Sequence, residues 1–458
     1  MNTSESLLLS VLGQHRAGQH LGLFSVCCAH DAVLHAALAH AHAHGYPLLI
    51  EATSNQVDQF GGYTGMQPRD FHAHVHMLAA RQGLNPRQLI LGGDHLGPNA
   101  WQHLDAATAM AHARVLVAAY VQAGFEKIHL DCSMRCADDP DRLSDEVAAQ
   151  RAADLCAAAE AARAQAPRGA PAPVYVIGTE VPPPGGERGA TAAPLQVTTP
   201  EAARRTVAQH ELAFARLGLQ GVWPRVVALV VQPGVDFDPS HVHHYQAQAA
   251  KPLAQLVEPS LATLGGWGHL LYEAHSTDYQ TEAALQALVR DHFAVLKVGP
   301  ALTFAWREAL FALAAIENTL RAGQSTSRLV EVLEACMLRE PRHWQSHYGS
   351  CPQQQYMLRH YAYSDRCRYY WGQPELQAAQ ATLMAHLEHC DLPLPLLSQH
   401  LPAQYEAVMQ GQLAPRANVL LTHHIQRVLD RYARACGLMT ASGLDSRLST
   451  FDAQAATS

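Results

Sequence analysis

An alternation of apolar runs with alanine-rich stretches repeats eight times along this chain, and it limits the possible folds more than any other feature. The runs are short and apolar at consecutive positions, as in parallel strands covered on both faces. They occupy 22–28, 47–53, 88–94, 127–133, 173–180, 225–232, 269–275 and 293–299. Amphipathic, helix-like stretches occupy 31–44, 68–82, 102–123, 144–165, 200–217, 240–257, 280–291 and 301–320. Eight such units predict an α/β fold, a (β/α)8 TIM barrel over residues 1–320.

An open, doubly wound sheet is the alternative arrangement for the same alternation. The first strand-to-helix turn, VCCAHDAV, lacks the GxGxxG fingerprint of dinucleotide-binding sheets, which favours the barrel. Residues 321–436 carry helix-like patterns without strands, and we expect a helical extension packed on the barrel. Residues 437–458 are small and polar, which predicts a flexible tail.

Composition excludes several classes of protein. Charged residues make up 16% of the chain, the net charge is −8 and no basic face is visible, so a nucleic-acid partner is not expected. No apolar run reaches about 18 residues, so no membrane span is expected. The N-terminal MNTSESLLLS does not resemble a signal peptide. The ten cysteines form no CxxC pair, which fits reduced thiols and predicts a cytoplasmic protein.

Polar side chains stand where several of the predicted strands end. Asp94 and His95 close the third strand, Glu180 the fifth and His275 the seventh. The strand ends of a barrel meet at one mouth, where polar residues usually serve catalysis or binding rather than stability. Two imidazoles and two carboxylates converging there predict a divalent metal with an acid/base group beside it. The pattern does not distinguish zinc, manganese, nickel and cobalt.

A structural explanation stays open for each of these residues. Successive side chains of a strand point to opposite sides, so we expect Asp94 and His95 to diverge, one transferring protons and the other binding metal. His275 would otherwise be a hydrogen-bonded core histidine, and Glu180 a helix cap. Gln232 holds the corresponding position in the sixth strand. Glutamine is a poor metal ligand, so a hydrogen bond to the loop backbone is its favoured interpretation.

Other polar residues at the strand ends are candidate substrate contacts. Barrels commonly bind phosphate in the loops after the last two strands, at a helix N-terminus. Ordinary capping remains the alternative for each residue taken singly. The candidates near those loops are Ser276, Thr277, Asp278, Lys297, Gly299 and Thr303. Earlier strands add Ser54, Asn55, Asp131 and Ser133.

Long, ordered motifs resemble the GatZ/KbaZ family of tagatose-bisphosphate aldolase subunits. They are IEATSNQVDQFGGYTGM, ILGGDHLGPNAWQ, HLDCSM, IGTEVPPPGG, YEAHSTDYQ and LKVGPALTFAWREALFAL. The similarity runs from about residue 20 to 320 and extends through YAYSDRCRYYW (361–371) and LTHHIQRVLDRY (421–432). The family is related to class II, zinc-dependent aldolases, so the resemblance implies a (β/α)8 fold and a phosphorylated ketohexose as substrate.

The resemblance also implies roles for individual residues. Class II aldolases place a catalytic Asp directly before a metal-binding His, which Asp94 and His95 match. They carry a Ser-Asn pair like Ser54-Asn55, a metal-binding His like His275 and a carboxylate like Glu180 that approaches the metal. The chain departs from them at the sixth strand, where Gln232 stands in place of a third histidine. That departure puts zinc affinity and ordinary aldolase activity in doubt.

Two functions follow as expectations. The first is an enzyme that interconverts D-tagatose 6-phosphate and D-fructose 6-phosphate by retro-aldol/aldol 4-epimerisation. Asp94 would move the proton of the C4 hydroxyl with Glu180 or Asp131 as partner, and His95 and His275 would hold the metal with Glu180 or Gln232. The alternative is a non-catalytic subunit that stabilises a catalytic class II D-tagatose-1,6-bisphosphate aldolase chain. An oligomer is expected in either case. A sugar kinase is disfavoured because no NTP-binding loop motif is present.

Overall fold

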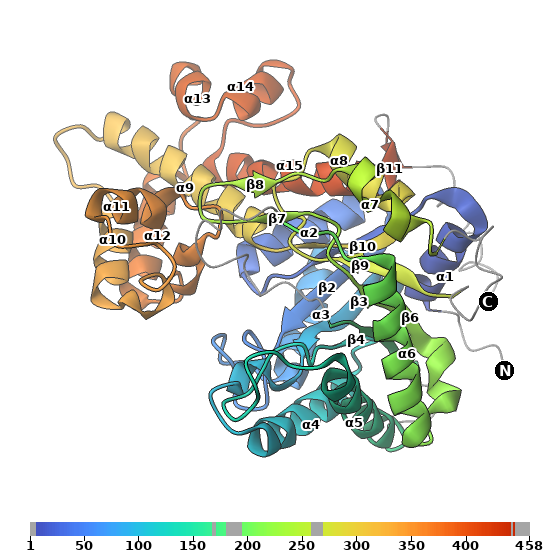
Figure 1. The fold of residues 1–458 in the computed structure, drawn as a ribbon. Helices are drawn as coiled ribbons and strands as arrows, with labels where there is room; N and C mark the ends of the chain where they lie inside the picture. The colour runs from blue at the N-terminus through green and yellow to red at the C-terminus, as the bar shows by residue number, and fades with distance from the viewer. Residues whose placement is uncertain (1–5, 167–170, 180–194, 258–268, 441–442, 445–458) are drawn as a thin grey trace.

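Eight parallel strands close into a barrel in this computed structural model, which describes residues 6–166, 171–179, 195–257, 269–440 and 443–444 (Figure 1). Around the barrel the strand order is β1-β10-β9-β6-β5-β4-β3-β2. Closure is direct, because β1 pairs with both β10 and β2. The predicted (β/α)8 TIM barrel is therefore confirmed, and the open sheet is excluded. The strands are β1 (Leu23–Val26), β2 (Leu48–Thr53), β3 (Leu89–Leu96), β4 (Lys127–Leu130), β5 (Val174–Ile177), β6 (Val226–Val230), β9 (Leu271–Ala274) and β10 (Phe293–Val298).

Helices follow the strands in the predicted order. Several begin at a side chain that accepts a hydrogen bond from the first helical turn, as Ser144 does from the Val147 amide and Thr199 from the Ala202 amide. These helices are α2 (Asp31–His44), α3 (Pro68–Gln82), α4 (Ala106–Ala123), α5 (Asp145–Arg163), α6 (Pro200–Arg216), α7 (Ala247–Ala254), α8 (Glu282–Arg290) and α9 (Pro300–Leu320). Helix α1 (Leu7–Gln14) and the hairpin of β7 (Asp236–Phe237) and β8 (Val242–His243) were not predicted.

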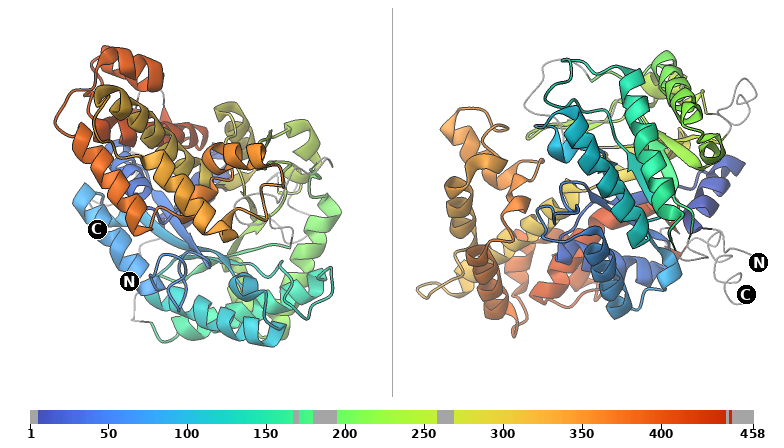
Figure 2. Two further views of the ribbon diagram at one scale, coloured as in Figure 1. Left: turned by 90° about the vertical axis from the view of Figure 1, so that its left-hand side faces the viewer. Right: turned by 90° about the horizontal axis from the view of Figure 1, so that it is seen from below.

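The region after α9 is helical, as its sequence pattern predicts, and Figure 2 shows its helices gathered on one side of the barrel. Helix α15 runs back along the barrel and packs against α2, α8 and α9. Its Tyr432 hydroxyl donates to the Thr277 carbonyl at 2.7 Å. The helices are α10 (Leu329–Arg339), α11 (Pro352–Tyr361), α12 (Pro374–Leu387), α13 (Leu394–His400), α14 (Pro402–Met409) and α15 (Ala417–Ala435).

Part of the segment predicted as a flexible tail has regular structure. Strand β11 (Met439–Thr440) pairs antiparallel with β12 (Gly443–Leu444). Within the described part of the chain, no helix combines the length and apolar character that crossing a membrane requires.

Buried charged side chains fill the interior of the barrel. Lys127 on β4 places Nζ 2.7 Å from Glu51 Oε1 on β2 and 2.7 Å from Glu273 Oε2 on β9. Lys297 on β10 pairs with the other oxygen of Glu51, and its Nζ lies 3.3 Å from Glu273 Oε1. All four residues are at most 4% exposed. Charges buried this deeply are tolerated when they are paired, and here the pairs join strands from different parts of the barrel.

Gly97 marks a close crossing of the chain segments that follow β3 and β4. A Cβ at this position would lie 1.7 Å from the backbone oxygen of Asp131. The Asp131 amide also donates to the Leu96 carbonyl at 3.0 Å. The absence of a side chain at Gly97 therefore allows the end of β4 to approach β3, which brings Asp131 beside His95.

The crossing predicts that Gly97→Ala is destabilising. The added methyl group forces a backbone shift, and we expect the free energy of unfolding to fall by at least about 1–3 kcal/mol. Gly13→Ala is the matched control, because no atom lies within 4 Å of its Cβ and helix α1 favours alanine over glycine. Denaturant unfolding followed by circular dichroism measures both variants. A Gly97→Ala protein as stable as the parent would contradict the close crossing.

Candidate active site

A cavity of about 430 Å³ opens where the barrel strands end, and the extension supplies part of its wall. It falls within the size range of small-molecule sites. Residues after β1, β2, β3, β9 and β10 line it, together with Arg368, Tyr369 and Trp371 from the extension. Many of the residues chosen from the sequence meet here: Asn55, Asp94, His95, His275, Ser276, Asp278, Lys297, Gly299 and Thr303.

Asp94 and His95 both line the cavity, although neighbouring strand residues were expected to diverge. The expectation failed because the strand is irregular at this point. The pairing of β3 with β4 shifts register between Gly93 and Leu96, and His95 has a φ of 49°. That left-handed conformation is costly for a non-glycine residue and is found mainly at functional sites. It turns both side chains toward the same space.

Asp131 and Ser133 lie behind His95, outside the residues that line the cavity. Asp131 Oδ2 accepts a hydrogen bond from His95 Nδ1 at 2.8 Å, and the Ser133 hydroxyl donates to Asp131 Oδ1 at 2.6 Å. Burial alone would raise the pKa of Asp131, but the hydrogen bond and charge of His95 hold it below its usual value. Asp131, predicted as an acid/base partner, therefore orients the ring of His95, and Ser133, predicted as a substrate contact, supports Asp131.

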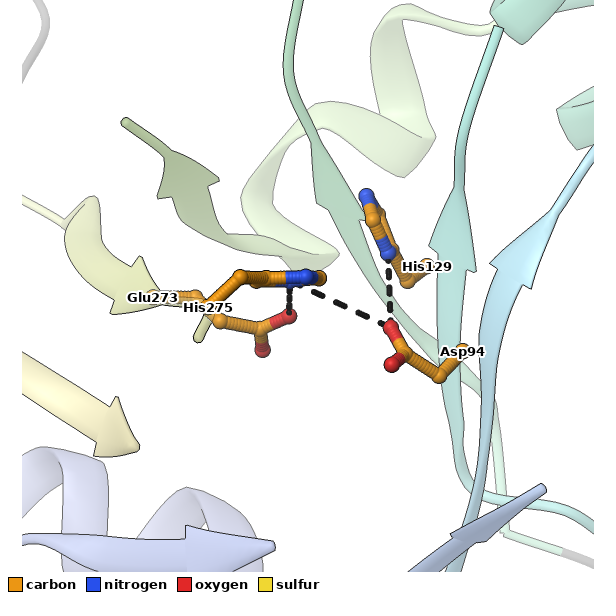
Figure 3. Close-up of side chains that lie close together, drawn as sticks. All are labelled: Asp94, His129, Glu273 and His275. Carbon is orange, nitrogen blue, oxygen red and sulfur yellow. Dashed lines mark hydrogen bonds and ion pairs between the residues drawn. The ribbon is translucent and has the colours of Figure 1, made fainter. Parts of the chain in front are cut away.

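Four buried side chains form a group able to hold a metal ion: Asp94, His129, Glu273 and His275. One ligand atom from each lies within 4.8 Å of those of the others. His275 Nε2 is 2.9 Å from Glu273 Oε1 and 3.9 Å from Asp94 Oδ1. His129 Nδ1 is 2.9 Å from Asp94 Oδ1, so it approaches Asp94 from the other side (Figure 3).

Sequence reasoning missed His129 and Glu273, although the pattern contained a signal. Lys127, His129 and Asp131 alternate with apolar residues in one strand, and Glu273 and His275 do so in another. Alternate residues of a strand share one face, so these polar side chains point together into the barrel. His129 gives the site a third imidazole. Its ring centroid lies 5.4 Å from that of His95 and 5.1 Å from that of His275.

The chemistry of this group fits a divalent cation. His129 Nε2 is buried without a hydrogen-bond partner, and burial lowers the pKa of His275 to about 4, which keeps that imidazole neutral. Neutral imidazoles and carboxylates are the ligands of zinc and related metals. The charges also agree, because the two lysines and the charged His95 balance only three of four buried carboxylates. These carboxylates are Glu51, Asp94, Asp131 and Glu273.

Asp94 lines the cavity and also belongs to the buried ion pairs of the barrel. Lys297 Nζ lies 2.9 Å from Asp94 Oδ1. Burial alone would raise the pKa of Asp94, but the charges of Lys297 and His95 outweigh it and hold the pKa well below its usual value. Asp94 is therefore ionised at neutral pH and able to accept a proton.

Two of the predicted residues take other places, and a third is not among the residues that the structure describes. The Gln232 side-chain oxygen accepts from the Gly234 amide at 2.8 Å and the Val235 amide at 3.0 Å, so it holds its own loop, as its favoured interpretation expected. Its amide oxygen is thereby committed away from the metal group. Ser54 is fully buried and does not line the cavity. Glu180, predicted both as a metal ligand and as an acid/base group, lies outside the described residues.

The expected phosphate site at the start of α9 is occupied by protein groups. Asp278 Oδ1 accepts from the Gly299 amide at 3.0 Å and the Ala301 amide at 2.8 Å. The Thr303 hydroxyl donates to Asp365 Oδ2 at 2.6 Å. The Thr277 hydroxyl donates to the carbonyl of Lys297 at 2.5 Å. The amides of Gly299 and Ala301 and the hydroxyls of Thr277 and Thr303 are thus already hydrogen-bonded within the protein.

The position of Asp278 generates a pH prediction. Burial raises its pKa to about 6 from 3.8, against the opposing effect of the hydrogen bonds from Ala301 and Gly299. Between these values the folded chain keeps a proton that the unfolded chain has released, so this residue lowers the free energy of unfolding as pH rises. Asp278→Asn removes the effect. The free energy of unfolding of Asp278→Asn, measured relative to that of the parent, should therefore increase from pH 4 to pH 7 by up to about 3 kcal/mol.

Asp105→Asn is the matched control for this measurement. Hydrogen bonds from Thr108 lower the pKa of Asp105, so this residue stabilises the protein more as pH rises. A lowered pKa changes stability mainly below the ordinary value of 3.8, so the stability of Asp105→Asn relative to the parent should stay nearly constant between pH 4 and pH 7. Denaturant unfolding at the two pH values measures both differences, and a pH-independent difference for Asp278→Asn would contradict the burial of its charge.

Solved structures resemble this chain to very different degrees. A probable tagatose 6 phosphate kinase from Sinorhizobium meliloti 1021 is 45% identical, with a TM-score of 0.80, over 91% of this chain and 100% of that chain. A fructose-bisphosphate aldolase from Campylobacter jejuni has a TM-score of 0.42 at 13% identity, over 87% of this chain and 92% of that chain. Function therefore has to be argued from the family and the site residues.

The sequence pattern described as D-tagatose-1,6-bisphosphate aldolase subunit GatZ/KbaZ-like matches residues 8–437. The match includes every strand of the barrel, the residues that line the cavity and the helices through α15. It confirms the resemblance carried by the sequence motifs. The chain belongs to the GatZ/KbaZ-like family of D-tagatose-1,6-bisphosphate aldolase subunits.

Proposed function

We propose that this protein is a metal-dependent enzyme that interconverts D-tagatose 6-phosphate and D-fructose 6-phosphate by inverting C4. The observation that carries the proposal is the buried group of Asp94, His129, Glu273 and His275 beside the cavity. Membership of the family gives the protein a role related to tagatose-bisphosphate aldolase. A site that keeps the His275 imidazole neutral next to ionised carboxylates supports metal-assisted chemistry rather than a purely structural barrel.

The reaction is accessible to an aldolase-like site. C4 of a 2-ketose is not adjacent to the carbonyl carbon, so enolisation alone does not invert it. When the C4 hydroxyl loses its proton, the C3–C4 bond breaks, C4 becomes an aldehyde, and the electron pair of the bond passes toward the C2 carbonyl. After the aldehyde presents its other face, the same electron pair re-forms the bond, and the proton returns to the C4 oxygen. Atoms and electrons balance without a further reactant.

The chain supplies groups for each part of this reaction. Asp94 is ionised, borders the cavity and in this proposal takes the C4 hydroxyl proton and returns it. His275 remains a proposed metal ligand, and His129 and Glu273 take the places proposed for Gln232 and Glu180. His95 lies outside this group and beside the His275 ring, with its own ring held by Asp131. A divalent metal bound there would supply Lewis-acid polarisation of the C2 carbonyl. Lys297, held among three carboxylates, keeps Asp94 and Glu273 in place.

A supporting subunit is the second candidate, because the family is described as an aldolase subunit. In that case the barrel would stabilise a separate catalytic chain and the site would turn over no substrate by itself. The name of the Sinorhizobium meliloti protein refers to a kinase. This chain lacks the GxxxxGK[ST] loop that holds nucleotide phosphates, so kinase activity is not proposed.

Metal binding is the first test of the proposal. His129→Ala removes a ligand of the group, and we expect at least a 10- to 100-fold loss of affinity for divalent metal, a range that alteration of outer ligands already reaches. His210→Ala is the control, because His210 is also fully buried but lies on α6 and bonds to the Thr206 carbonyl. Elemental analysis and metal titration measure the result. Equal metal content in both variants and the parent would contradict the assigned group.

Turnover is the second test. Asp94→Asn should lower kcat for conversion of fructose 6-phosphate about 10²- to 10⁴-fold, because the variant has no carboxylate to accept the proton. Asp31→Asn changes another aspartate that lines the same cavity and should keep turnover. Product analysis with added divalent metal measures both, with rates expressed per bound metal. Full turnover of metal-loaded Asp94→Asn would contradict the role of Asp94. An inert parent chain that gains a function only in complex with an aldolase chain would favour the supporting subunit.

A further inference from the structure

We propose that Arg368, supplied by the extension, binds the phosphate group of the substrate. This inference rests on the proposed function for the identity of the sugar phosphate. Among the described residues that line the cavity, the lysine and arginine side chains are Lys297 and Arg368. Lys297 is committed to the carboxylates of Glu51, Asp94 and Glu273. Arg368 is therefore the lining cation that remains for an anionic ligand.

The other parts of the cavity wall are less suited to bind a phosphate. The start of α9 already holds the carboxylate of Asp278, which accepts from the Gly299 and Ala301 amides. A phosphate placed there would compete with that carboxylate for the same donors. At the metal group, the carboxylates of Asp94 and Glu273 repel a phosphate placed against them, and Lys297 is already paired with both. Both features direct the phosphate toward the extension side of the cavity.

The extension holds Arg368 in a fixed place. Arg368 donates through Nη1 to the carbonyls of Ser364 and Asp365, and through Nη2 to the Tyr369 hydroxyl at 2.8 Å. Its Nε proton takes part in none of the hydrogen bonds described for this side chain. A guanidinium held by part of its donors keeps a charged N–H group for an oxygen of a phosphate.

The segment that carries Arg368 is anchored to the barrel. Asp365 accepts from Thr303 at 2.6 Å and from Arg307 Nε at 3.0 Å, both on α9. Asp365 itself has a φ of 43°, a conformation that needs support from its surroundings. A ring contact adds to the anchor, because the ring centroids of Trp371 and Trp306 lie 4.5 Å apart. The motif YAYSDRCRYYW, for which the metal group leaves no role, is thereby explained as the support of an anion site.

The experiment measures binding rather than turnover. Isothermal titration of the full-length, metal-loaded protein with fructose 6-phosphate and with unphosphorylated fructose gives the contribution of the phosphate. Arg368→Gln should raise Kd for fructose 6-phosphate about tenfold or more and leave Kd for fructose unchanged. Arg368→Lys keeps the charge but loses the planar set of donors. Its Kd for fructose 6-phosphate should therefore fall between those of the parent and of Arg368→Gln. Arg342→Gln, an exposed arginine of the extension outside this cavity, is the control and should bind like the parent.

A second measurement uses the parent protein, in case Arg368→Gln fails to fold. Arginine-directed labelling by phenylglyoxal, mapped by mass spectrometry, should be slowed at Arg368 by fructose 6-phosphate or inorganic phosphate, and not by fructose. Labelling of Arg342 should not change. Unchanged Kd in Arg368→Gln, or no protection of Arg368, overturns the assignment.

The outcomes separate this inference from the proposed function. If the parent binds fructose 6-phosphate through Arg368 but does not convert it, the phosphate site stands and the epimerase proposal fails. If the parent converts the sugar and Arg368→Gln binds it equally well, the epimerase proposal stands and the phosphate site fails. If neither sugar phosphate nor inorganic phosphate binds, the phosphate site is refuted.

Discussion

The ion pairs around Lys297 are the interaction on which the site depends. This ammonium group contacts carboxylates from β2, β3 and β9, three strands that are distant in the sequence. Its charge, with that of Lys127, compensates carboxylates that would be too costly to bury alone. The same charge keeps Asp94 ionised at the edge of the cavity. Barrel closure and the chemistry of the mouth are thus linked through one buried lysine side chain.

The fold was predictable because its main signals are local. Apolar runs and amphipathic stretches gave all eight strands of the barrel, and α2 and α3 have the bounds that their sequence pattern predicts. Helix α1 was missed because it precedes the repeat. The hairpin after β6 was missed because it is short, and its strand β8 falls within the stretch 240–257 that was predicted as helix. The positions of Asp94, His95 and His275 at strand ends were also readable, since a barrel brings such ends to one mouth.

The composition of the site was less predictable, because it depends on packing. His129 and Glu273 belong to the metal group through inward-facing positions within strands, whereas the sequence reasoning considered only strand ends. The convergence of Asp94 and His95 depends on a local register shift that no pattern announces. Arg368 lies about 70 residues beyond the last strand, so only the folded extension reveals that it borders the cavity.

The extension has a consequence for the order in which the protein assembles. The cavity wall includes Cys27, which follows the first barrel strand, and Gln377 on α12 of the extension. The first barrel strand is also tied to the last helix, because the Gly22 amide donates to the Cys436 carbonyl at 2.9 Å. Contacts between such distant segments form slowly, since a long loop must close first. During synthesis, ligand-binding competence therefore arises only after nearly the whole polypeptide has left the ribosome, and a prematurely released chain has an incomplete cavity.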